Sequence, residues 1–424
     1  MTKKSDAPAI RFKGFSDAWE QRKLSEITDK VTEKNAGLQY VETFTNSAEF
    51  GIISQRDFFD HDIAKLGSLD GYYIVKTEDF VYNPRISTSA PVGPINRNKL
   101  GRTGVMSPLY TVFRPHDIDT TYLEYFFKCG YWHSFMNFNG DSGARSDRFS
   151  IRDNVFFQMP IPIPDIDEQR KIGELLTCLD NLITLHQRKF EKLTNVKKSM
   201  LEKMFPQNGS SYPEIRFKGF TDPWEQRKFD EVFDCTVPNN TLSRAELSYD
   251  EGTVLNVHYG DVLIKYGSVL DVQKDDIPRI PHRCREDFNG ALLQDGDVII
   301  ADTAEDETTG KTCEIGNLQG SAIVSGLHTM VCRPRNRMAL GYLGYYLNSN
   351  AYHHQLLPLM QGIKVLSLSR SNIQKTSVSY PIAVKEQQLI AYYFSQLDNL
   401  ITLHQRELEK LQNIKKSMLE KMFV

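Results

Sequence analysis

The sequence predicts an α+β fold in which two globular domains are separated by two long antiparallel helices. The helices form a coiled-coil stalk, and the whole chain is a pseudo-twofold internal repeat. Three observations predict this fold. The block PAIRFKGFSDAWEQRK at 8–23 returns as PEIRFKGFTDPWEQRK at 213–228, and the block at 168–205 returns at 386–423. Between the blocks lie short β-branched and aromatic runs separated by Gly, Pro and Asn, as in sheet-containing domains.

The first repeated block marks the start of each half. Its spacing is too long for a solenoid repeat, so it indicates a duplicated domain. Because both copies are nearly identical, the block is not expected to bind a ligand that differs between the two halves. Its aromatic residues are instead expected to anchor the start of each globular domain against the base of a helix: Phe12, Phe15, Trp19, Phe217, Phe220 and Trp224.

The second repeated block predicts a long helix at the end of each half. After its first few residues neither copy contains Pro or Gly, and both are rich in Leu, Lys, Glu and Gln. Apolar residues recur at steps of three and four, as in a coiled-coil seam. The predicted seam residues are Leu176, Leu179, Ile183, His186, Phe190 and Leu193 in the first helix, and Phe394, Leu397, Ile401, His404, Leu408 and Leu411 in the second.

Polar residues interrupt this seam at equivalent places in the two helices. Lys197 and Lys415 are expected to fix the register of the pairing, as polar seam residues commonly do. If the helices run antiparallel and overlap fully, His186 and His404 meet at the pseudo-twofold axis. The alternative is that they are two unrelated surface histidines.

Five consecutive segments follow from the repeat. The first globular domain spans 1–165 and its helix 166–205, a linker follows at 206–212, and the second domain spans 213–384 with its helix at 385–424. Pro206 and the Gly- and Ser-containing stretch after it end the first helix. A common skeleton survives between the blocks, as in TYLEYFF at 121–127 and GYLGYYL at 341–347. The domains therefore share a scaffold and differ in their loops.

The distribution of charge is more informative than its sum. A net charge of −3 argues against a protein that coats nucleic acid by bulk electrostatics, but it allows a local basic patch. Residues 83–116 and 315–385 contain no Asp or Glu, yet both windows contain several Arg and Lys. Their corresponding places in the two halves favour a polyanionic ligand. The alternative is that both are ordinary solvated surfaces.

Other classes of protein are disfavoured by composition. No apolar run follows the first lysines, and no stretch of eighteen apolar residues occurs, so neither a signal peptide nor a membrane span is expected. The six cysteines form no Cys-x-x-Cys pair. They are therefore interpreted as reduced thiols of a cytoplasmic protein without a zinc site.

Two unlike domains held at a fixed separation are suited to reading two different short DNA sites. Dimeric DNA-binding proteins read identical half-sites spaced by helical turns, so their target mirrors their symmetry. Here the loops differ between the halves, so the two half-sites are expected to differ as well.

Each half of the chain combines two motifs, IRFKGFxDxWEQRK at its start and EQ…LDNLITLHQR…KKSMLEKMF at its end. In this combination the chain resembles the specificity subunit of type I restriction-modification systems. The resemblance covers about 8–424 and includes the order of target recognition domain and helix. It implies a non-catalytic subunit that binds double-stranded DNA at an asymmetric bipartite sequence. It further implies two methyltransferase subunits that use S-adenosylmethionine and restriction/translocase subunits that use ATP and Mg²⁺. No cofactor is expected in this chain, and no membrane partner.

Little transfers residue by residue into the loops, so the DNA contacts are predicted from chemistry. Arg and Lys bind guanine edges or phosphates, and Asn, Ser and Thr bind adenine edges or backbone oxygens. The predicted DNA-binding residues are Asn83, Arg85, Arg97, Arg102, Arg145 and Arg148 in the first domain, and Lys265, Tyr266, Lys311, Lys364, Ser369 and Arg370 in the second.

Three alternatives to this DNA-binding subunit remain. The first is an enzyme that acts alone on nucleic acid. An adenine methyltransferase would need an Asn/Asp-Pro-Pro-aromatic motif, and an ATP motor would need a Walker motif; the sequence has neither. A nuclease carboxylate–lysine cluster is not excluded by spacing. A coiled-coil scaffold explains the helices but not the two acid-free windows. The third alternative is a specificity subunit of a combined cutting-and-methylating enzyme.

Overall fold

The computed structural model describes residues 7–59, 66–141, 147–207 and 209–423, which fall into two compact units. The first unit comprises 1–186 together with 407–424, and the second comprises 187–406. Each unit thus contains one globular domain, the first part of the helix that follows it and the last part of the other long helix. This division differs from the five consecutive segments expected from the sequence, because both helices contribute to both units.

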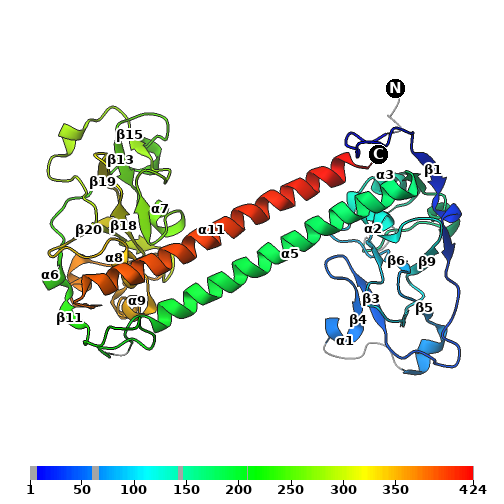
Figure 1. The fold of residues 1–424 in the computed structure, drawn as a ribbon, viewed down its shortest axis with the longest axis horizontal. Helices are drawn as coiled ribbons and strands as arrows, with labels where there is room; N and C mark the ends of the chain where they lie inside the picture. Colours follow the sequence, from blue (N-terminus) through cyan, green and yellow to red (C-terminus); the bar gives the residue numbers. More distant parts are fainter. Residues whose placement is uncertain (1–6, 60–65, 142–146, 208, 424) are drawn as a thin grey trace. The chain divides into compact units, whose positions relative to one another are not determined.

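The first unit is built around a four-stranded antiparallel sheet of order β2-β9-β6-β7 (Figure 1). Three two-stranded sheets, β1-β10, β3-β4 and β5-β8, accompany it. Its strands are β1 (Glu20–Lys23), β2 (Thr28–Lys30), β3 (Phe44–Ser47), β4 (Gly51–Ser54), β5 (Tyr73–Val75), β6 (Phe80–Tyr82), β7 (Ile95–Arg97), β8 (Gly104–Met106), β9 (Thr111–Pro115) and β10 (Pro160–Ile163). Its helices are α1 (Gln55–Phe58), α2 (Thr120–Cys129), α3 (Trp132–Asn139), α4 (Asp153–Phe156) and the first part of α5 (Ile166–Lys203).

The second unit repeats this plan with a five-stranded sheet of order β12-β20-β16-β18-β14. A three-stranded sheet, β15-β13-β19, and the pairs β11-β22 and β17-β21 accompany it. Its strands are β11 (Glu225–Lys228), β12 (Phe233–Asp234), β13 (Val254–Val257), β14 (Val269–Asp271), β15 (Arg279–Ile280), β16 (Val298–Ala301), β17 (Thr303–Ala304), β18 (Thr312–Gly316), β19 (Ala322–Ser325), β20 (Thr329–Pro334), β21 (Leu366–Ser367) and β22 (Ser377–Tyr380). Its helices are α6 (Phe229–Val232), α7 (Tyr259–Ile264), α8 (Tyr342–Leu347), α9 (Asn350–His353), α10 (Arg370–Ile373) and the first part of α11 (Val384–Lys421). The predicted α+β class with an internal repeat is confirmed.

Helix α2 illustrates how local sequence sets an element that the core needs. Asp119 caps its start by accepting a hydrogen bond from the backbone N–H of Tyr122, and Gly130 ends it in the left-handed conformation. The helix buries Tyr122, Phe126 and Phe127 against the sheet. Apolar residues at this helical spacing make one face of α2 part of the core.

The repeated first block is tied to the start of each long helix by a buried carboxylate. Arg11 donates from Nε and Nη2 to the two carboxylate oxygens of Glu168 at 2.9 and 2.7 Å, and Trp19 donates from Nε1 at 3.2 Å. Glu168 is fully buried, and its hydrogen bond raises the pKa of Arg11.

The second unit repeats this lock. Arg216 donates to both carboxylate oxygens of Glu386 at 2.7 and 2.8 Å, and Trp224 donates from Nε1 at 3.3 Å. The expected anchoring by Trp19 and Trp224 is confirmed. The arginine of IRFKGF is a further anchor that the sequence did not reveal.

The end of each long helix completes the core of the unit that belongs to the other half. Met422 and Phe423 at the end of α11 are buried in the core of the first unit, where Phe423 lies 5.4 Å from the ring of Tyr122. In the same way Met204 and Phe205 at the end of α5 are buried in the core of the second unit.

The backbone repeats this arrangement. The N–H of Ile10 donates to the carbonyl of Lys421 at 3.0 Å, and the N–H of Ile215 donates to that of Lys203 at 2.9 Å. Each copy of IRFKGF therefore follows the end of a long helix in space, although only the second copy follows one in the chain.

Within each unit the two long helices pair antiparallel through a tyrosine, an aspartate and a lysine. In the first unit the hydroxyl of Tyr125 donates to Asp180 at 2.8 Å, and Lys415 pairs with the same carboxylate at 2.5 Å. In the second unit Tyr345, Asp398 and Lys197 repeat this cluster at 2.9 and 2.5 Å. Lys197 and Lys415 thus make specific ion pairs, as expected of residues that fix register.

The predicted seam residues divide between domain cores and helix surfaces. Leu176 and Leu179 share the core cluster of the first unit with Leu411, and Phe394 and Leu397 share that of the second unit with Leu193. The others are half-buried: Ile183, His186, Phe190, Ile401, His404 and Leu408. His186 and His404 belong to different units, so their meeting stays a prediction.

A buried carboxylate predicts an unusual pH dependence for the second unit. Glu314 in β18 accepts hydrogen bonds from the backbone N–H groups of Gly341 and Gly344 at 2.9 and 2.8 Å. Burial nevertheless raises its pKa from 4.5 to about 7. Because the folded pKa is the higher one, the stability due to this group is complete below about pH 4.5 and is lost as the pH rises through 7.

We therefore expect the unfolding free energy of the native chain, relative to Glu314→Gln, to fall by about 3 kcal/mol between pH 4.5 and pH 8. Denaturant titrations of both proteins across this range measure the difference. Parallel pH profiles for the two proteins would contradict this role of Glu314.

Candidate nucleic-acid interface

Two loops of the first unit pair at the rim of the main sheet. The loop after β6 and the segment at 147–150 are held together by hydrogen bonds from Ile86 N to Asp147 O at 3.0 Å and from Phe149 N to Pro84 O at 2.7 Å. This pairing places Arg85 directly opposite Arg148 in an antiparallel bridge. Two of the predicted DNA-binding residues are therefore neighbours in space.

The first of these loops is shaped by Asn83 and Gly93. The side chain of Asn83 donates to the carbonyl of Asn46 at 2.8 Å and accepts from the N–H of Arg85 at 3.0 Å. Gly93 has a φ of +85°, and a Cβ there would lie 2.1 Å from the carbonyl oxygen of Asn83. Asn83 thus holds the loop that presents Arg85, and its side-chain amide is occupied by the protein.

Arg85 and Arg148 form an uncompensated pair of cations. Both are exposed, and neither makes an ion pair among the described residues. Side chains opposite each other in an antiparallel pair lie on one face within about 5.5 Å at Cβ, and like charges there are destabilising. A bound anion would relieve this repulsion, so the pair is a favourable place for phosphate or a guanine edge.

A groove of about 430 Å³ lies beside Arg148. Its wall includes Tyr73, Tyr110 and Phe149, and Lys30 in the wall is paired with Asp153. Phe149 is buried and the ammonium of Lys34 lies 3.4 Å over the ring of Tyr73, so Tyr110 is the half-buried aromatic residue left beside Arg148. Exposed aromatic rings accept stacked bases in nucleic-acid-binding proteins.

The second unit has paired loops at the equivalent place but with different chemistry. Strands β17 and β21 pair Thr303 with Ser367, which correspond to Arg85 and Arg148. The turn before β21 depends on Gly362, whose φ is +127° and where a Cβ would lie 1.9 Å from the carbonyl oxygen of Val365. It exposes Lys364.

The start of α10 lies at the same loop. Ser369 caps this helix by accepting from the N–H of Asn372 at 3.2 Å, and Arg370 is exposed in its first turn. In the facing loop Glu305, Asp306 and Glu307 are exposed. The second unit therefore presents small hydroxyls, separate cations and nearby carboxylates where the first presents two arginines.

Arg97 has a structural role instead of an exposed one. Its guanidinium is buried and pairs with Glu124 at 2.5 Å and with Glu78 at 2.9 Å. The equivalent strand position in the second unit is occupied by Glu314, which binds the start of α8. Both residues join the main sheet to the helix behind it, so we leave Arg97 out of the interface.

The other predicted DNA-binding residues are also engaged by the protein. Arg102 makes a bidentate pair with Glu42 at 2.8 Å, Lys265 pairs with Asp276 at 2.9 Å, and Lys311 donates to the carbonyl of Leu263 at 2.7 Å. Burial lowers the pKa of Lys311.

Tyr266 is buried in the core of the second unit, where burial raises its pKa, so it also leaves the set. Arg145 lies outside the described residues. The exposed cations of the predicted set that make no ion pair among the described residues are Arg85 and Arg148 in the first unit and Lys364 and Arg370 in the second.

The two acid-free windows of the sequence are not free of acids in space. Arg114 pairs with Asp79 at 2.7 Å, and Arg333 repeats this pair with Asp297 at 2.7 Å. Carboxylates from outside each window thus neutralise several of its cations. The sequence pattern overstated the positive charge of both surfaces.

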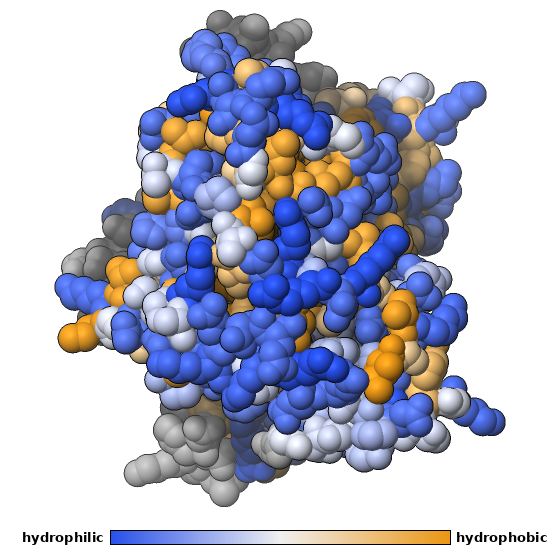
Figure 2. Space-filling view, turned by 90° about the vertical axis from the view of Figure 1, so that its left-hand side faces the viewer, coloured by the Kyte–Doolittle hydropathy of each residue, from blue (hydrophilic) through white to orange (hydrophobic). Residues whose placement is uncertain are grey.

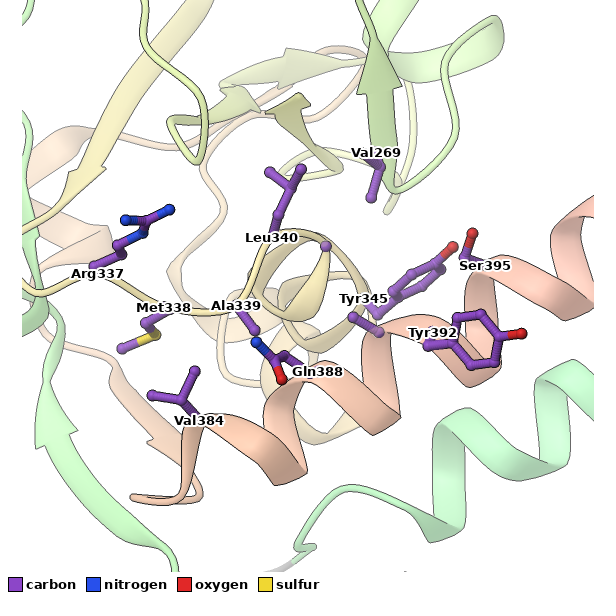
Figure 3. Close-up of a pocket in the computed structure, with 12 residues that line it drawn as sticks. Val269, Arg337, Met338, Ala339, Leu340, Tyr345, Val384, Gln388, Tyr392 and Ser395 are labelled. Carbon is purple, nitrogen blue, oxygen red and sulfur yellow. The ribbon is translucent and has the colours of Figure 1, made fainter. Parts of the chain in front are cut away.

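Another concave surface of the second unit is of a different kind. It has a volume of about 890 Å³, and Figure 3 shows Leu340, Val384 and Tyr392 around it with Arg337 at one end. It offers one cation and mostly apolar side chains, so we do not assign it to nucleic acid. The side of the second unit that faces the viewer in Figure 2 is mainly hydrophilic, with separate hydrophobic patches.

Neither a metal site nor a membrane span is found in the part of the chain that the structure describes. Within the described ranges no group of three or more His, Cys, Asp or Glu side chains could hold a metal ion. None of the helices described has the length and apolar character needed to cross a membrane.

The family of "Type I restriction modification DNA specificity domain" proteins matches the chain twice, at residues 16–195 and 221–413. A curated relative from Methanocaldococcus jannaschii, the type I restriction enzyme MjaVIII specificity subunit, is 23% identical over 275 residues, which are 62% of this chain and 61% of the relative. The putative type I restriction enzyme MjaX specificity subunit from the same organism is 22% identical over 283 residues, 64% of this chain and 60% of the relative. The chain therefore matches about three-fifths of the length of these relatives.

Among solved structures, the S subunit of a type I restriction-modification system from M. genitalium is similar in fold. It has a TM-score of 0.53 and 13% sequence identity, and the alignment covers 99% of both chains. At this identity the similarity concerns the fold.

Proposed function

Because the chain belongs to the family of type I restriction modification DNA specificity domains, with one matched region in each half, we propose that it recognises an asymmetric bipartite DNA sequence. It acts as a non-catalytic specificity subunit. Each unit reads one half of the target, and neither unit carries out chemistry on the DNA.

The observation that supports this proposal most directly is the pair of loops repeated in both units. The backbone pairing is the same, but it presents Arg85 and Arg148 in one unit and Thr303 and Ser367 in the other. A scaffold that is kept while its presented side chains change is what two readers of different sequences require.

The chemistry of the loops sets expectations for the half-sites. Arg85 and Arg148 can bind guanine O6 and N7 or flanking phosphates. In the second unit Lys364 and Arg370 would bind phosphates, while Thr303 and Ser367 offer short hydroxyls to base edges. The first half-site should therefore depend more strongly on guanine than the second.

We propose two methyltransferase subunits and restriction/translocase subunits as further partners. The support is the repeat itself, since each unit presents the same junction between its domain and the two long helices. S-adenosylmethionine, ATP and Mg²⁺ would be used by those subunits, and the complex would act on DNA in the cytoplasm.

Replacing Arg148 with alanine should weaken binding of the target by about 1–3 kcal/mol, or roughly 5- to 150-fold. The loss should concern the first half-site only, because Arg148 belongs to the first unit. Filter binding of the chain with its methyltransferase subunits measures the change in affinity. Repeating the titration at several salt concentrations shows how many phosphates the variant no longer binds, because the salt slope falls with each one.

Arg102→Ala is the matched control, because Arg102 is also exposed but is already paired with Glu42. We expect it to change affinity less than Arg148→Ala does. Equal losses of affinity for both variants would overturn the assignment of the loop. Absence of any salt-sensitive binding by the complex would favour a scaffold without a DNA role.

A further inference from the structure

Two cysteines of the second unit face each other across neighbouring strands. Strands β12 and β20 pair Phe233 with Pro334 and Asp234 with Arg333, so the next residues in register are Cys235 and Cys332. Their sulfur atoms are hydrogen-bonded at 3.2 Å. Both side chains are buried, Cys332 more completely than Cys235.

The strand geometry suits a covalent bond between them. The N–H of Arg335 donates to the carbonyl of Val232 at 2.8 Å, which makes that pair a hydrogen-bonded one. Hydrogen-bonded and non-hydrogen-bonded pairs alternate along antiparallel strands, so Cys235 and Cys332 form a non-hydrogen-bonded pair. The Cα atoms of such pairs lie about 4.5 Å apart, inside the range of about 4.4–6.8 Å that disulfides span.

The surroundings distinguish the two thiols. The hydrogen bond with Cys332 and the positive charge of Arg370 lower the pKa of Cys235, and burial raises the pKa of Cys332. The equivalent place in the first unit holds an ion pair between Lys30 and Asp153. Position 235 thus lies beside the first turn of a short helix, and in the second unit a thiol takes this place near the positive charge of Arg370.

We propose that Cys235 and Cys332 form a reversible disulfide site that hydrogen peroxide oxidises. The Cys235 thiolate attacks one peroxide oxygen and the O–O bond breaks, which gives a sulfenic acid on Cys235 and a hydroxide ion. The hydroxide then takes up a proton to become water. The sulfur of Cys332, as it loses its proton, then attacks the sulfur of Cys235 and displaces a second water. Two thiols and one peroxide thus give one disulfide and two waters.

The site is specific to the second unit. The residues at the equivalent strand positions of the first unit are Lys30 and Phe113. The other four cysteines are Cys129, Cys178, Cys284 and Cys313, and no hydrogen bond or disulfide joins any of these to another cysteine among the described residues. Oxidation should therefore link β12 to β20 in one reader and leave the other unchanged.

Peptide mapping of the full chain without reduction tests this site. The reduced protein is treated with hydrogen peroxide, its free thiols are alkylated in denaturant, and its peptides are analysed by mass spectrometry. We expect one cross-linked pair that contains Cys235 and Cys332, lighter by two hydrogens than the separate peptides and released by dithiothreitol. Alkylated Cys235 and Cys332 after treatment, or Cys235 recovered only as sulfinic acid, would overturn the proposal.

Two variants separate a reacting pair from general oxidation of buried thiols. In Cys332→Ala, Cys235 should be trapped as a sulfenic acid that dimedone labels, because its resolving thiol is missing. Cys313→Ala removes another buried thiol and should leave the cross-link unchanged. Loss of the cross-link in Cys313→Ala, or absence of dimedone labelling at Cys235 in Cys332→Ala, would contradict the assignment. Should Cys332→Ala fail to fold, the mapping of the native chain and of Cys313→Ala decides.

Discussion

Replacing Glu168 with alanine should destabilise the first unit by about 3–5 kcal/mol, because breaking a buried ion pair leaves its partner uncompensated. The guanidinium of Arg11 and the indole N–H of Trp19 both lose their acceptor at once. The indole of Trp19 is buried, and the guanidinium of Arg11, which is partly exposed, keeps only its hydrogen bond to the carbonyl of Asp17 at 2.7 Å among the described residues. We therefore expect the loss of stability to spread through the first unit and spare the second.

Hydrogen exchange followed unit by unit measures this effect. Faster exchange is expected in the first unit for Glu168→Ala and in the second unit for Glu386→Ala, which removes the equivalent carboxylate. Arg170→Ala is the control, since it breaks only an exposed pair with Asp167, worth about 0–1 kcal/mol. Equal loss of protection in both units for either glutamate variant would contradict the independence of the two locks.

Replacing Phe423 with alanine should also destabilise the first unit, by about 3–5 kcal/mol, through the cavity left in its core. This residue is buried against Tyr122 and Phe126, although it belongs to the helix that follows the second domain in the chain. Phe205→Ala should have the same effect on the second unit, where Phe205 is fully buried beside Phe394.

Denaturant unfolding followed by hydrogen exchange assigns each loss of stability to a unit. Leu185→Ala is the matched control, because Leu185 lies on a long helix but is exposed, and it should change stability by less than about 0.5 kcal/mol. If Phe423→Ala destabilised the second unit instead, the exchange of helix ends between the units would be wrong.

The fold was largely predictable because its main features are periodic or repeated. The duplicated blocks indicated two domains, and the heptad-like spacing indicated the long helices at nearly their observed bounds. Which domain each helix end would join was not predictable, because KKSMLEKMF is identical in both copies. Only the tertiary contacts of Phe205 and Phe423 distinguish the two connections.

The interface was predictable only in part, because ion pairs are set by tertiary neighbours. Arg97 and Arg102 stand in an acid-free stretch of sequence, yet Glu78, Glu124 and Glu42 neutralise them in space. Tyr266 follows Lys265 directly in the sequence but is buried. A signal for Arg85 was present, since the segment around it is rich in turn-forming residues and ends at Gly93.

The repeat also shows how one scaffold serves two chemistries. The aspartate–arginine, tyrosine–aspartate–lysine and glutamate–arginine contacts recur in both units with nearly the same distances. The paired loops at the rim share a backbone pattern and differ in every presented side chain. Contacts that build the scaffold are therefore separate from the loop residues that we propose to contact DNA.

Recognition of two unlike half-sites is tested most directly by selecting bound sequences from a random pool of DNA with the chain and its methyltransferase subunits, and then sequencing them. We expect two different short half-sites separated by a spacer of constant length and unspecified sequence, with Arg148→Ala relaxing one half only. A single uninterrupted site, a palindrome, or relaxation of both halves by that one substitution would contradict the presence of two independent readers.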